Sequence, residues 1–448
     1  MSSSKKSLSP QGVIALGFAV IILIVTLLLM LPVSSSSGKV TDPLTALFTA
    51  TSAVCVTGLV VVDTATHWSL FGRIVLMIGI QIGGLGVMTV LAFAAALMGQ
   101  RIGLRQRTLL VESISALHIG GVVRLMRRAV FGTLLVEGMG ALLLSLRFVP
   151  MLGFARGMGY AVFHAVSAFC NAGFDLMGTI SGPYTSLESF VGDPLINLTV
   201  MALILLGGLG FYVWDDLIES RLRPSRMHLH TRIVLRISAV IVLIPTVLFY
   251  ILEFSGSMAG FSQRERILAS LFSAVTPRTA GFDTVPTGSL SEASSLLTML
   301  LMLVGGNPGS TAGGAKTTTM LLILLSAMAM LRREDEVSLL GRRIESALLK
   351  KACSIVVIYV GVALAASMAI CALQPEIPLR DVLLEVFSAI DTVGMTTGVT
   401  RQMVAASQII LIALMYGGRL GSLTFALLAA RHPLPAPVRY PSGELLVG

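Results

Sequence analysis

Charged residues are scarce in this sequence. Only 12% of its 448 residues are Asp, Glu, Lys or Arg, whereas about a quarter of an average soluble domain is charged. Hydrophobic residues make up 55% of the chain. This composition excludes an ordinary soluble domain and predicts a protein that crosses the membrane several times. The first apolar run, residues 12–33, is long enough to span a bilayer and lacks a signal-peptide cleavage site, so we expect a retained first span.

Cysteines and catalytic motifs are also few. The four cysteines have no spacing typical of a zinc site, a redox pair or a disulfide framework: Cys55, Cys170, Cys353 and Cys371. Residues 309–314 have the glycine spacing of a phosphate-binding loop, but Ala315 stands where that motif needs lysine, and no strand precedes it. An intramembrane enzyme would need paired carboxylates, a Ser–His pair or a metal cluster, and we find no such partner for His164. We therefore do not expect an enzyme.

The net charge of +9 comes from basic residues that lie between the apolar runs. They gather in three short loops, at 101–128, 221–236 and 332–351, and Lys5 and Lys6 precede the first span. This placement follows the positive-inside rule and argues against nucleic-acid binding. We expect a multi-pass protein of the cytoplasmic membrane, with these loops and both chain termini in the cytoplasm.

Four stretches of the chain match one another without gaps. They are FTATSAVCVTGL (48–59), FHAVSAFCNAGF (163–174), LFSAVTPRTAGF (271–282) and LEVFSAIDTVGM (384–395). Each has a glycine ten positions after its first residue: Gly58, Gly173, Gly281 and Gly394. A double glycine inside an apolar run follows each of them, at GGLG (83–86), GGLG (207–210), GGNPG (305–309) and GGRLG (417–421). The repeats divide the chain into four units, 1–100, 101–222, 223–340 and 341–448, the last of which includes a C-terminal tail.

Each unit contains a helical segment that is too short to cross a membrane. These segments are 44–56, 160–171, 264–277 and 380–391, each about 12 to 14 residues long, a length typical of re-entrant segments. Irregular backbone at membrane depth is tolerated where it is buried in protein or lines a water-filled cavity. The sequence therefore predicts an all-α membrane protein with eight transmembrane spans and four re-entrant pore helices around a central pore.

The four glycine turns that follow these short helices suit a cation. Glycine adopts backbone angles that other residues avoid, so the carbonyl groups of all four turns can face one axis. A ring of carbonyls can replace the hydration shell of an alkali cation, and the negative ends of the helix dipoles also favour positive charge. The turns carry no ring of acidic residues; only Asp391 is close to one of them. The alternative is that the glycines serve helix packing, as Gly79 and Gly83 would.

The turn sequences VCVTG, CNAGFD, RTAGFDT and TVGMTTG, together with GGNPGSTAGGAKTTT (305–319), resemble the Trk/Ktr/HKT superfamily of cation transporters. The chain is most similar to the KtrB-like membrane subunit of Ktr potassium uptake systems. The resemblance implies that each filter glycine and the two residues before it supply carbonyls for K⁺. These are Val56, Thr57, Gly58, Asn171, Ala172, Gly173, Thr279, Ala280, Gly281, Thr392, Val393 and Gly394. Serine at the first filter glycine is associated with sodium in the family, so Gly58 favours potassium.

The same resemblance implies a regulated assembly: a homodimer docked on a cytoplasmic, KtrA-like ring of nucleotide-binding subunits, with Na⁺ as an activator. The Pro-rich tail, 431–448, is either a free end or a dimer contact. Since no ATP motif is present, the membrane potential must drive the flux. A rocking transporter built from inverted repeats is a rival, although four repeats of the same topology suit a central pore better. A sodium or non-selective cation channel of the same fold is the second alternative.

The second span of the third unit is interrupted by small and polar residues. Pro308 breaks the helix locally, and the resemblance implies a flexible intramembrane loop at 305–319 that obstructs the pore. The predicted gate residues are Gly305, Gly306, Gly309, Ser310, Thr311, Ala312, Gly313, Gly314, Lys316 and Arg419. Lys316 is either a second barrier or the polar edge of the resumed helix.

Arg419 lies within an apolar span, where a charge costs several kcal/mol and usually faces the protein interior. The repeat alignment places it with Leu85, Leu209 and Asn307. We expect its side chain to enter the pore, to contact carbonyls of the intramembrane loop and to repel cations. A snorkelling arginine at a helix end is the alternative.

Three aspartates follow the first three glycine turns on the outer side: Asp63, Asp175 and Asp283. They are either solvated charges and helix caps or an outer vestibule that concentrates cations.

Overall fold

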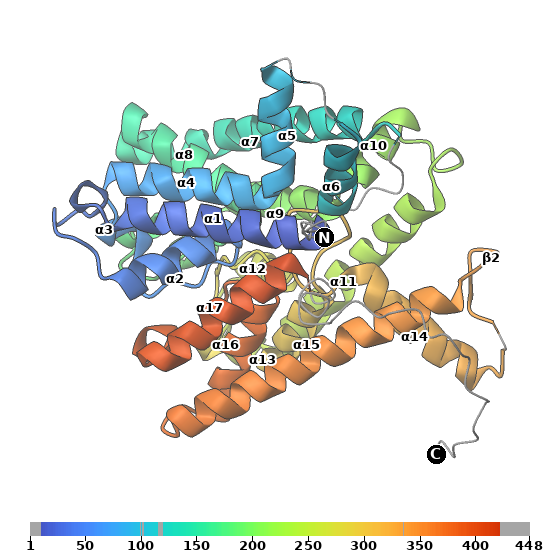
Figure 1. Ribbon diagram of the computed structural model, residues 1–448. Helices are drawn as coiled ribbons and strands as arrows, with labels where there is room; N and C mark the ends of the chain where they lie inside the picture. Colours follow the sequence, from blue (N-terminus) through green and yellow to red (C-terminus); the bar gives the residue numbers. More distant parts are fainter. Residues whose placement is uncertain (1–9, 99, 101–102, 115–119, 335, 422–448) are drawn as a thin grey trace.

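The computed structural model describes residues 10–98, 100, 103–114, 120–334 and 336–421 (Figure 1). The first unit contains α1 (Pro10–Met30), η1 (Pro32–Ser34), α2 (Pro43–Val54), α3 (Thr64–His67), α4 (Leu70–Leu85) and α5 (Val87–Leu97). The second contains α6 (Leu104–Ile114), α7 (Val122–Leu152), α8 (Phe154–Phe169), η2 (Met177–Thr179), η3 (Glu188–Phe190), α9 (Pro194–Leu209) and α10 (Phe211–Glu219). The fold is therefore almost wholly helical, as the sequence predicts.

The second half of the chain repeats this order. The third unit contains α11 (Leu229–Leu252), α12 (Gln263–Val275), η4 (Thr287–Ser289), α13 (Glu292–Val304) and α14 (Thr317–Leu331). A small hairpin of β1 (Ser338–Leu339) and β2 (Arg342–Arg343) leads to the fourth unit. That unit contains α15 (Ser346–Leu373), α16 (Leu379–Ile390), η5 (Val399–Gln402) and α17 (Ala405–Leu420). The four short helices α2, α8, α12 and α16 occupy equivalent places in the four units.

Among the described residues, four helices are long and apolar enough to cross a membrane: α1, α7, α11 and α15. The other four expected spans are not simple rods. α4 and α5 meet at 96°, α9 and α10 meet at 91°, the intramembrane loop separates α13 from α14, and α17 ends at Leu420. Figure 1 shows α5 turned across the direction of α4.

The bends lie at the last glycine of each GGLG motif. Gly86 and Gly210 have φ of 85° and 97°, a conformation that favours glycine and ends the preceding helix. The sequence analysis expected a double glycine midway along a continuous span. The structure differs because the glycine two positions later turns the chain.

The short helices begin at recognisable caps. Asp42 accepts hydrogen bonds from the amides of Leu44 and Thr45 at 3.0 and 3.1 Å, and Pro43 takes the first helical position of α2. Ser262 and Glu265 form a capping box at the start of α12. α8 begins at Phe154, earlier than the expected 160, because Gly153 with φ of 80° lets the chain re-enter a helix directly after α7.

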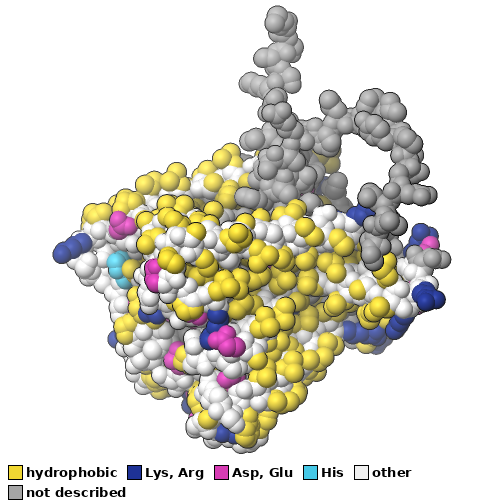
Figure 2. All heavy atoms as spheres, turned by 90° about the horizontal axis from the view of Figure 1, so that it is seen from below, with side chains coloured by type: hydrophobic (Ala, Val, Ile, Leu, Met, Phe, Trp, Pro, Cys, Tyr) yellow, Lys and Arg dark blue, Asp and Glu magenta, His cyan; other side chains and the backbone are white. Residues whose placement is uncertain are grey.

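Hydrophobic side chains cover most of the face of the molecule seen in Figure 2. Long helices carry large apolar residues that protein does not cover, such as Val357 and Met368 of α15, 70% and 73% exposed. A soluble protein rarely exposes such continuous apolar surface. The outer faces of these helices therefore suit contact with lipid, and the structure fits a multi-pass membrane protein.

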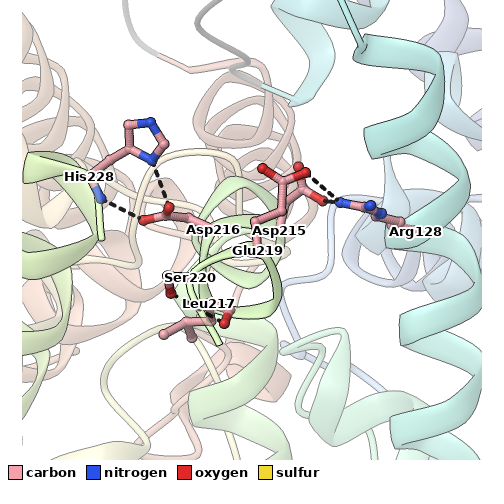
Figure 3. Close-up of polar contacts among 7 residues, drawn as sticks. All are labelled: Arg128, Asp215, Asp216, Leu217, Glu219, Ser220 and His228. Carbon is pink, nitrogen blue, oxygen red and sulfur yellow. Dashed lines mark hydrogen bonds and ion pairs between the residues drawn. The ribbon is translucent and has the colours of Figure 1, made fainter. Parts of the chain in front are cut away.

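Polar contacts fix α10, which lies beyond the bend at Gly210. Asp215 and Glu219 pair with Arg128 of α7, the latter at 3.0 Å, while Asp216 accepts a 2.6 Å bond from His228 at the start of α11. Figure 3 shows these carboxylates pointing to opposite sides of α10. The bent segment is thus held from both sides by neighbouring helices.

Candidate ion pathway

The four glycine turns share one unusual backbone conformation. The filter glycines have positive φ, and so do the residues two positions before them. These angles are 57° at Val56, 59° at Asn171, 66° at Thr279 and 50° at Thr392. Positive φ is uncommon for residues other than glycine, especially β-branched ones. Its recurrence at four equivalent positions makes the turns one repeated structural element.

The four glycines lie against one another in a closed ring. A Cβ added to Gly58 would lie 2.6 Å from the carbonyl oxygen of Ala172. One added to Gly173 would lie 2.8 Å from Ala280 O, one on Gly281 2.5 Å from Val393 O, and one on Gly394 would collide with Thr57 O. Each glycine therefore contacts the next turn in chain order, and the fourth contacts the first. Any side chain at these positions would intrude on a neighbouring carbonyl.

Serines at the ends of the pore helices hold two of the turns. The amide of Gly58 donates to Ser52 Oγ at 3.0 Å, and that of Gly394 donates to Ser388 Oγ at the same distance. The amides of Thr57 and Val393 each donate to the carbonyl of the same serine at 2.8 Å. With the amides bound to the helix, the carbonyls remain free to face the ring.

The sequence analysis did not single out these serines. Their signal is a Ser-Ala pair that begins six residues before the glycine in three of the four repeats. The third repeat has Val275 at that position, and there Thr276 donates from Oγ1 to the carbonyl of Phe282 at 2.6 Å instead.

A cavity of about 300 Å³ lies on the outer side of the ring. The four filter glycines line it, together with the carboxylates of Asp63, Asp175, Glu188 and Asp283 and the guanidinium of Arg401. Asp63 caps α3 through the amide of Thr66 at 2.9 Å, and it also lines the cavity; that it concentrates cations stays a prediction. Glu188 lies in the long loop between α8 and α9, where no repeat pattern indicated it.

Burial raises the pKa of two of these carboxyl groups. Burial raises the pKa of Asp175 to about 7, although the amide of Met177 donates to it at 2.8 Å. Burial likewise raises the pKa of Asp283 to about 8, against the opposing hydrogen bond from Thr287, and the nearby Glu188 and Asp175 charges add to the rise. The outer cavity therefore becomes more negative as the pH rises through this range.

A second cavity, of about 520 Å³, lies next to the intramembrane loop. It is lined by the loop residues Gly309, Ser310, Ala312, Gly314 and Lys316, by the bend at Gly84–Gly86, and by Arg419. We call it the inner cavity. Six of the ten predicted gate residues thus line one space.

The intramembrane loop is shorter than expected. It runs from Gly305 to Lys316, because Thr317 already begins α14. It is bonded mainly to the second unit. Asn307 Nδ2 donates to Gly208 O at 2.8 Å, Thr311 Oγ1 donates to Phe169 O at 3.0 Å, and the amide of Phe211 donates to Gly309 O at 2.9 Å.

Arg419 contacts the intramembrane loop, as the sequence analysis expected. Its Nη1 donates to the carbonyl of Thr311, and its Nη2 donates to the carbonyls of Gly83 and Gly84, the latter at 3.3 Å. The guanidinium therefore joins the bend of α4 to the loop across the inner cavity.

The repeat alignment of Arg419 needs a correction. Gly83, Gly207 and Gly418 each press against a carbonyl at the end of the pore helix of their own unit. The glycines three positions later, Gly86, Gly210 and Gly421, each have positive φ and end a helix. Arg419 is thus equivalent to Gly84 and Gly208, not to Leu85 and Leu209. The error arose because GGRLG has one more residue than GGLG.

Lys316 and Asp391 also lie at the loop. The ammonium of Lys316 donates to the carbonyls of Ala312 and Gly313 at 2.8 and 3.2 Å, and the residue is the N-cap of α14. The fully buried Asp391 ends α16, and a Cβ on Gly314 would lie 3.2 Å from its Oδ1. No role for Asp391 was expected from the sequence, but the structure places it between the fourth glycine turn and the loop.

Comparison with known proteins gives concordant matches. The family model described as a cation transport protein, TrkH, matches residues 9–440. The chain is 39% identical over 442 residues to the Ktr system potassium uptake protein B of Bacillus subtilis, covering 98% of this chain and 97% of that protein. It is 38% identical over 451 residues to the potassium/sodium uptake protein NtpJ of Enterococcus hirae, covering 99% and 98%.

A solved structure has the same fold. The potassium transporter TrkH from Vibrio parahaemolyticus superimposes with a TM-score of 0.71 at 17% identity, covering 96% of this chain and 87% of that one.

Proposed function

Because this chain belongs to the TrkH family of cation transport proteins, we propose that it takes up potassium across the cytoplasmic membrane through the ring of glycine turns. The observation that carries this proposal is the closed ring of four turns with one shared backbone conformation. Such a ring presents carbonyl oxygens from four directions, which is how a filter replaces the hydration shell of K⁺. The outer cavity would supply ions to it.

Two observations favour potassium over sodium as the transported ion. The relatives are named as potassium uptake proteins, and the first turn carries Gly58. The name of the relative NtpJ includes both ions, so a sodium or non-selective pathway of the same fold is the second candidate. Ion replacement in a flux assay distinguishes the two.

The proposed gate lies below the filter. The intramembrane loop fills space beside the inner cavity, and Arg419 places a positive charge there. A cation that leaves the filter would meet this charge before it reaches the cytoplasm. Opening would therefore require the loop and the guanidinium to separate or move aside together.

Regulation and assembly extend the proposal. The relatives are components of Ktr systems, whose name implies more than one subunit. We propose a homodimer on a cytoplasmic KtrA-like ring of nucleotide-binding subunits, with cytoplasmic chain termini and Na⁺ as an activator. The tail 431–448, a proposed dimer contact, lies outside the described residues.

The test is complementation of a bacterial strain that cannot take up potassium. The native chain should restore growth at low external K⁺. Gly281→Ser should weaken this growth and admit sodium, because the new side chain would lie against Val393 O. Gly159→Ala is the matched control, since its Cβ would meet nothing within 4 Å. Unchanged growth and sodium exclusion in Gly281→Ser would contradict the filter assignment.

A further inference from the structure

A single acidic residue lies in the middle of the longest helix. Glu137 is the one acidic residue of α7, and its side chain is only 5% exposed. An ionisable group at membrane depth costs several kcal/mol by insertion scales. Such residues usually face the protein interior and mark functional regions. Glu137 belongs neither to the ring of glycine turns nor to the gate residues.

Both carboxyl oxygens of Glu137 accept hydrogen bonds from uncharged groups. Gln81 of α4 donates from Nε2 to Oε2 at 3.1 Å. The thiol of Cys170 donates to Oε1 at 3.7 Å, and it also lies 3.8 Å from Gln81 Oε1. The three side chains come from α4, α7 and the end of α8. Their contacts connect the first unit to the second outside the ring of glycine turns.

Cys170 is the link between this cluster and the filter. It is fully buried, it ends α8, and the next residue is Asn171, which begins the second glycine turn with φ of 59°. A Cβ on Gly84 would lie 2.6 Å from Cys170 Sγ, so the thiol has no room to move toward α4. Glu137 contacts the thiol from α7.

The cluster also borders the proposed gate. The same Gly84 that packs on Cys170 accepts a hydrogen bond from Arg419 at 3.3 Å. The carboxyl group of Glu137 is thus connected to the guanidinium by three contacts, through Cys170 and Gly84.

We propose that Glu137 is a positioning residue for ion selectivity, which acts through Cys170 on the carbonyls of the second glycine turn. This inference rests on the proposed function, because it assumes that these carbonyls bind the ion. Selectivity depends on where the carbonyls lie, and the thiol is bonded to the chain one residue before them. Loss of the carboxyl group would let Cys170 shift and would loosen one side of the ring.

The experiment compares K⁺ and Na⁺ flux in vesicles that contain the full-length protein. Glu137→Leu should lower the K⁺/Na⁺ permeability ratio about tenfold, equivalent to about 1.4 kcal/mol. Glu137→Gln keeps an acceptor for the thiol and should stay within about twofold of the native ratio. Cys170→Ala should reproduce the loss, and the double variant should be no worse than either single one.

Thr133→Val is the matched control. Thr133 lies one turn earlier on α7, is also fully buried, and its hydroxyl has no partner among the described residues. It should leave the ratio unchanged.

The proposal is overturned if Glu137→Leu lowers protein amount and total flux but keeps the native ratio, or if Cys170→Ala keeps the native ratio. If Glu137→Leu does not fold, Cys170→Ala and Glu137→Gln still decide the matter. Absence of K⁺ flux from the native protein would instead refute the proposed function.

Discussion

At residue 419 a guanidinium occupies a place that glycine takes in the first two units. It donates hydrogen bonds to the carbonyls of Thr311 in the intramembrane loop and of Gly83 and Gly84 at the bend of α4. The arginine is therefore both a hydrogen-bond donor that closes the inner cavity and a fixed positive charge in the proposed ion path.

Arg419→Ala is expected to raise potassium flux through the isolated subunit roughly tenfold, a change that needs only about 1.4 kcal/mol of lowered barrier. The measurement is uptake into vesicles at equal protein content. Arg226→Ala, at an exposed site between α10 and α11, serves as the control and should have no effect. Native flux in a correctly folded Arg419→Ala protein would show that the guanidinium is not a barrier.

The outer carboxylates predict a pH dependence. Asp175 and Asp283, with pKa values of about 7 and 8, are neutral below these values and charged above them. Asp63 and Glu188 line the same cavity, and Arg401 is the basic residue in its lining. Uptake at low K⁺ should therefore rise as the external pH increases from about 6 to 9, because a negative cavity concentrates cations.

The double variant Asp175→Asn with Asp283→Asn should flatten this profile. The native advantage should also shrink at high salt, where charges are screened within a few ångströms. Glu376→Gln, exposed at the end of α15, is the control. A double variant with the native pH profile would assign these aspartates to structure alone.

Residues that repeat could be predicted from the sequence, whereas isolated ones could not. The four glycines recur at one spacing, so their convergence followed from the repeat. Glu137 and Glu188 belong to no repeat in the sequence, and the positions equivalent to Asp391 hold Cys55, Cys170 and Arg278. Their surroundings depend on which helices come together in space, and no local pattern records that.

Among the elements, the ends of three of the four pore helices are packed by the second helix of their own unit. Gly83, Gly207 and Gly418 let the second helix touch the carbonyls of Val54, Phe169 and Ile390. The close contact explains one of the two glycines in the double-glycine motif of each of these units. The close approach places the bend directly beside the glycine turn, so the filter and the inner cavity share a wall.

Gly207→Ala should destabilise the protein, because the added methyl group would collide with the Phe169 carbonyl. We expect a loss of about 1–3 kcal/mol, the usual cost of overpacking. Thermal unfolding in detergent measures it as a lower Tm. Gly159→Ala, in α8 with open space around it, should hold or raise the Tm, since alanine favours helices by about 0.5–1 kcal/mol.

The sequence indicated these elements more reliably than their directions. Apolar runs and capping residues predicted where the helices lie, and Pro308 predicted the break in the third unit. The bends at Gly86 and Gly210 were not expected, because a lone glycine in an apolar run is compatible with a straight helix. The positive φ that produces the bend is visible only in the folded chain.

At the scale of the whole molecule, four units enclose one axis and leave a cavity on each side of the ring. Figure 1 shows α1, α4, α7 and α8 of the first two units running side by side. The division into units at 100, 222 and 340 remains a prediction, and it agrees with the repeated order of elements. The sequence predicts passive flux, which follows the electrochemical gradient.

The accumulation of potassium should therefore scale with membrane potential. A potential of 100 mV supplies about 2.3 kcal/mol per unit charge, enough for roughly fiftyfold accumulation. Sealed vesicles with an imposed potential and no ATP should reach this ratio and lose it when the potential collapses. Accumulation that persists without a potential would demand a coupled ion.

Because one polypeptide contributes all four turns of the ring, the four turns need not have the same sequence. The buried position three residues before each filter glycine holds Cys55, Cys170, Arg278 and Asp391 in turn. Four identical subunits would have to crowd four arginines or four aspartates around the same opening. In this chain a single missense mutation changes one turn and leaves the other three unchanged. Natural variation can therefore alter the ring asymmetrically.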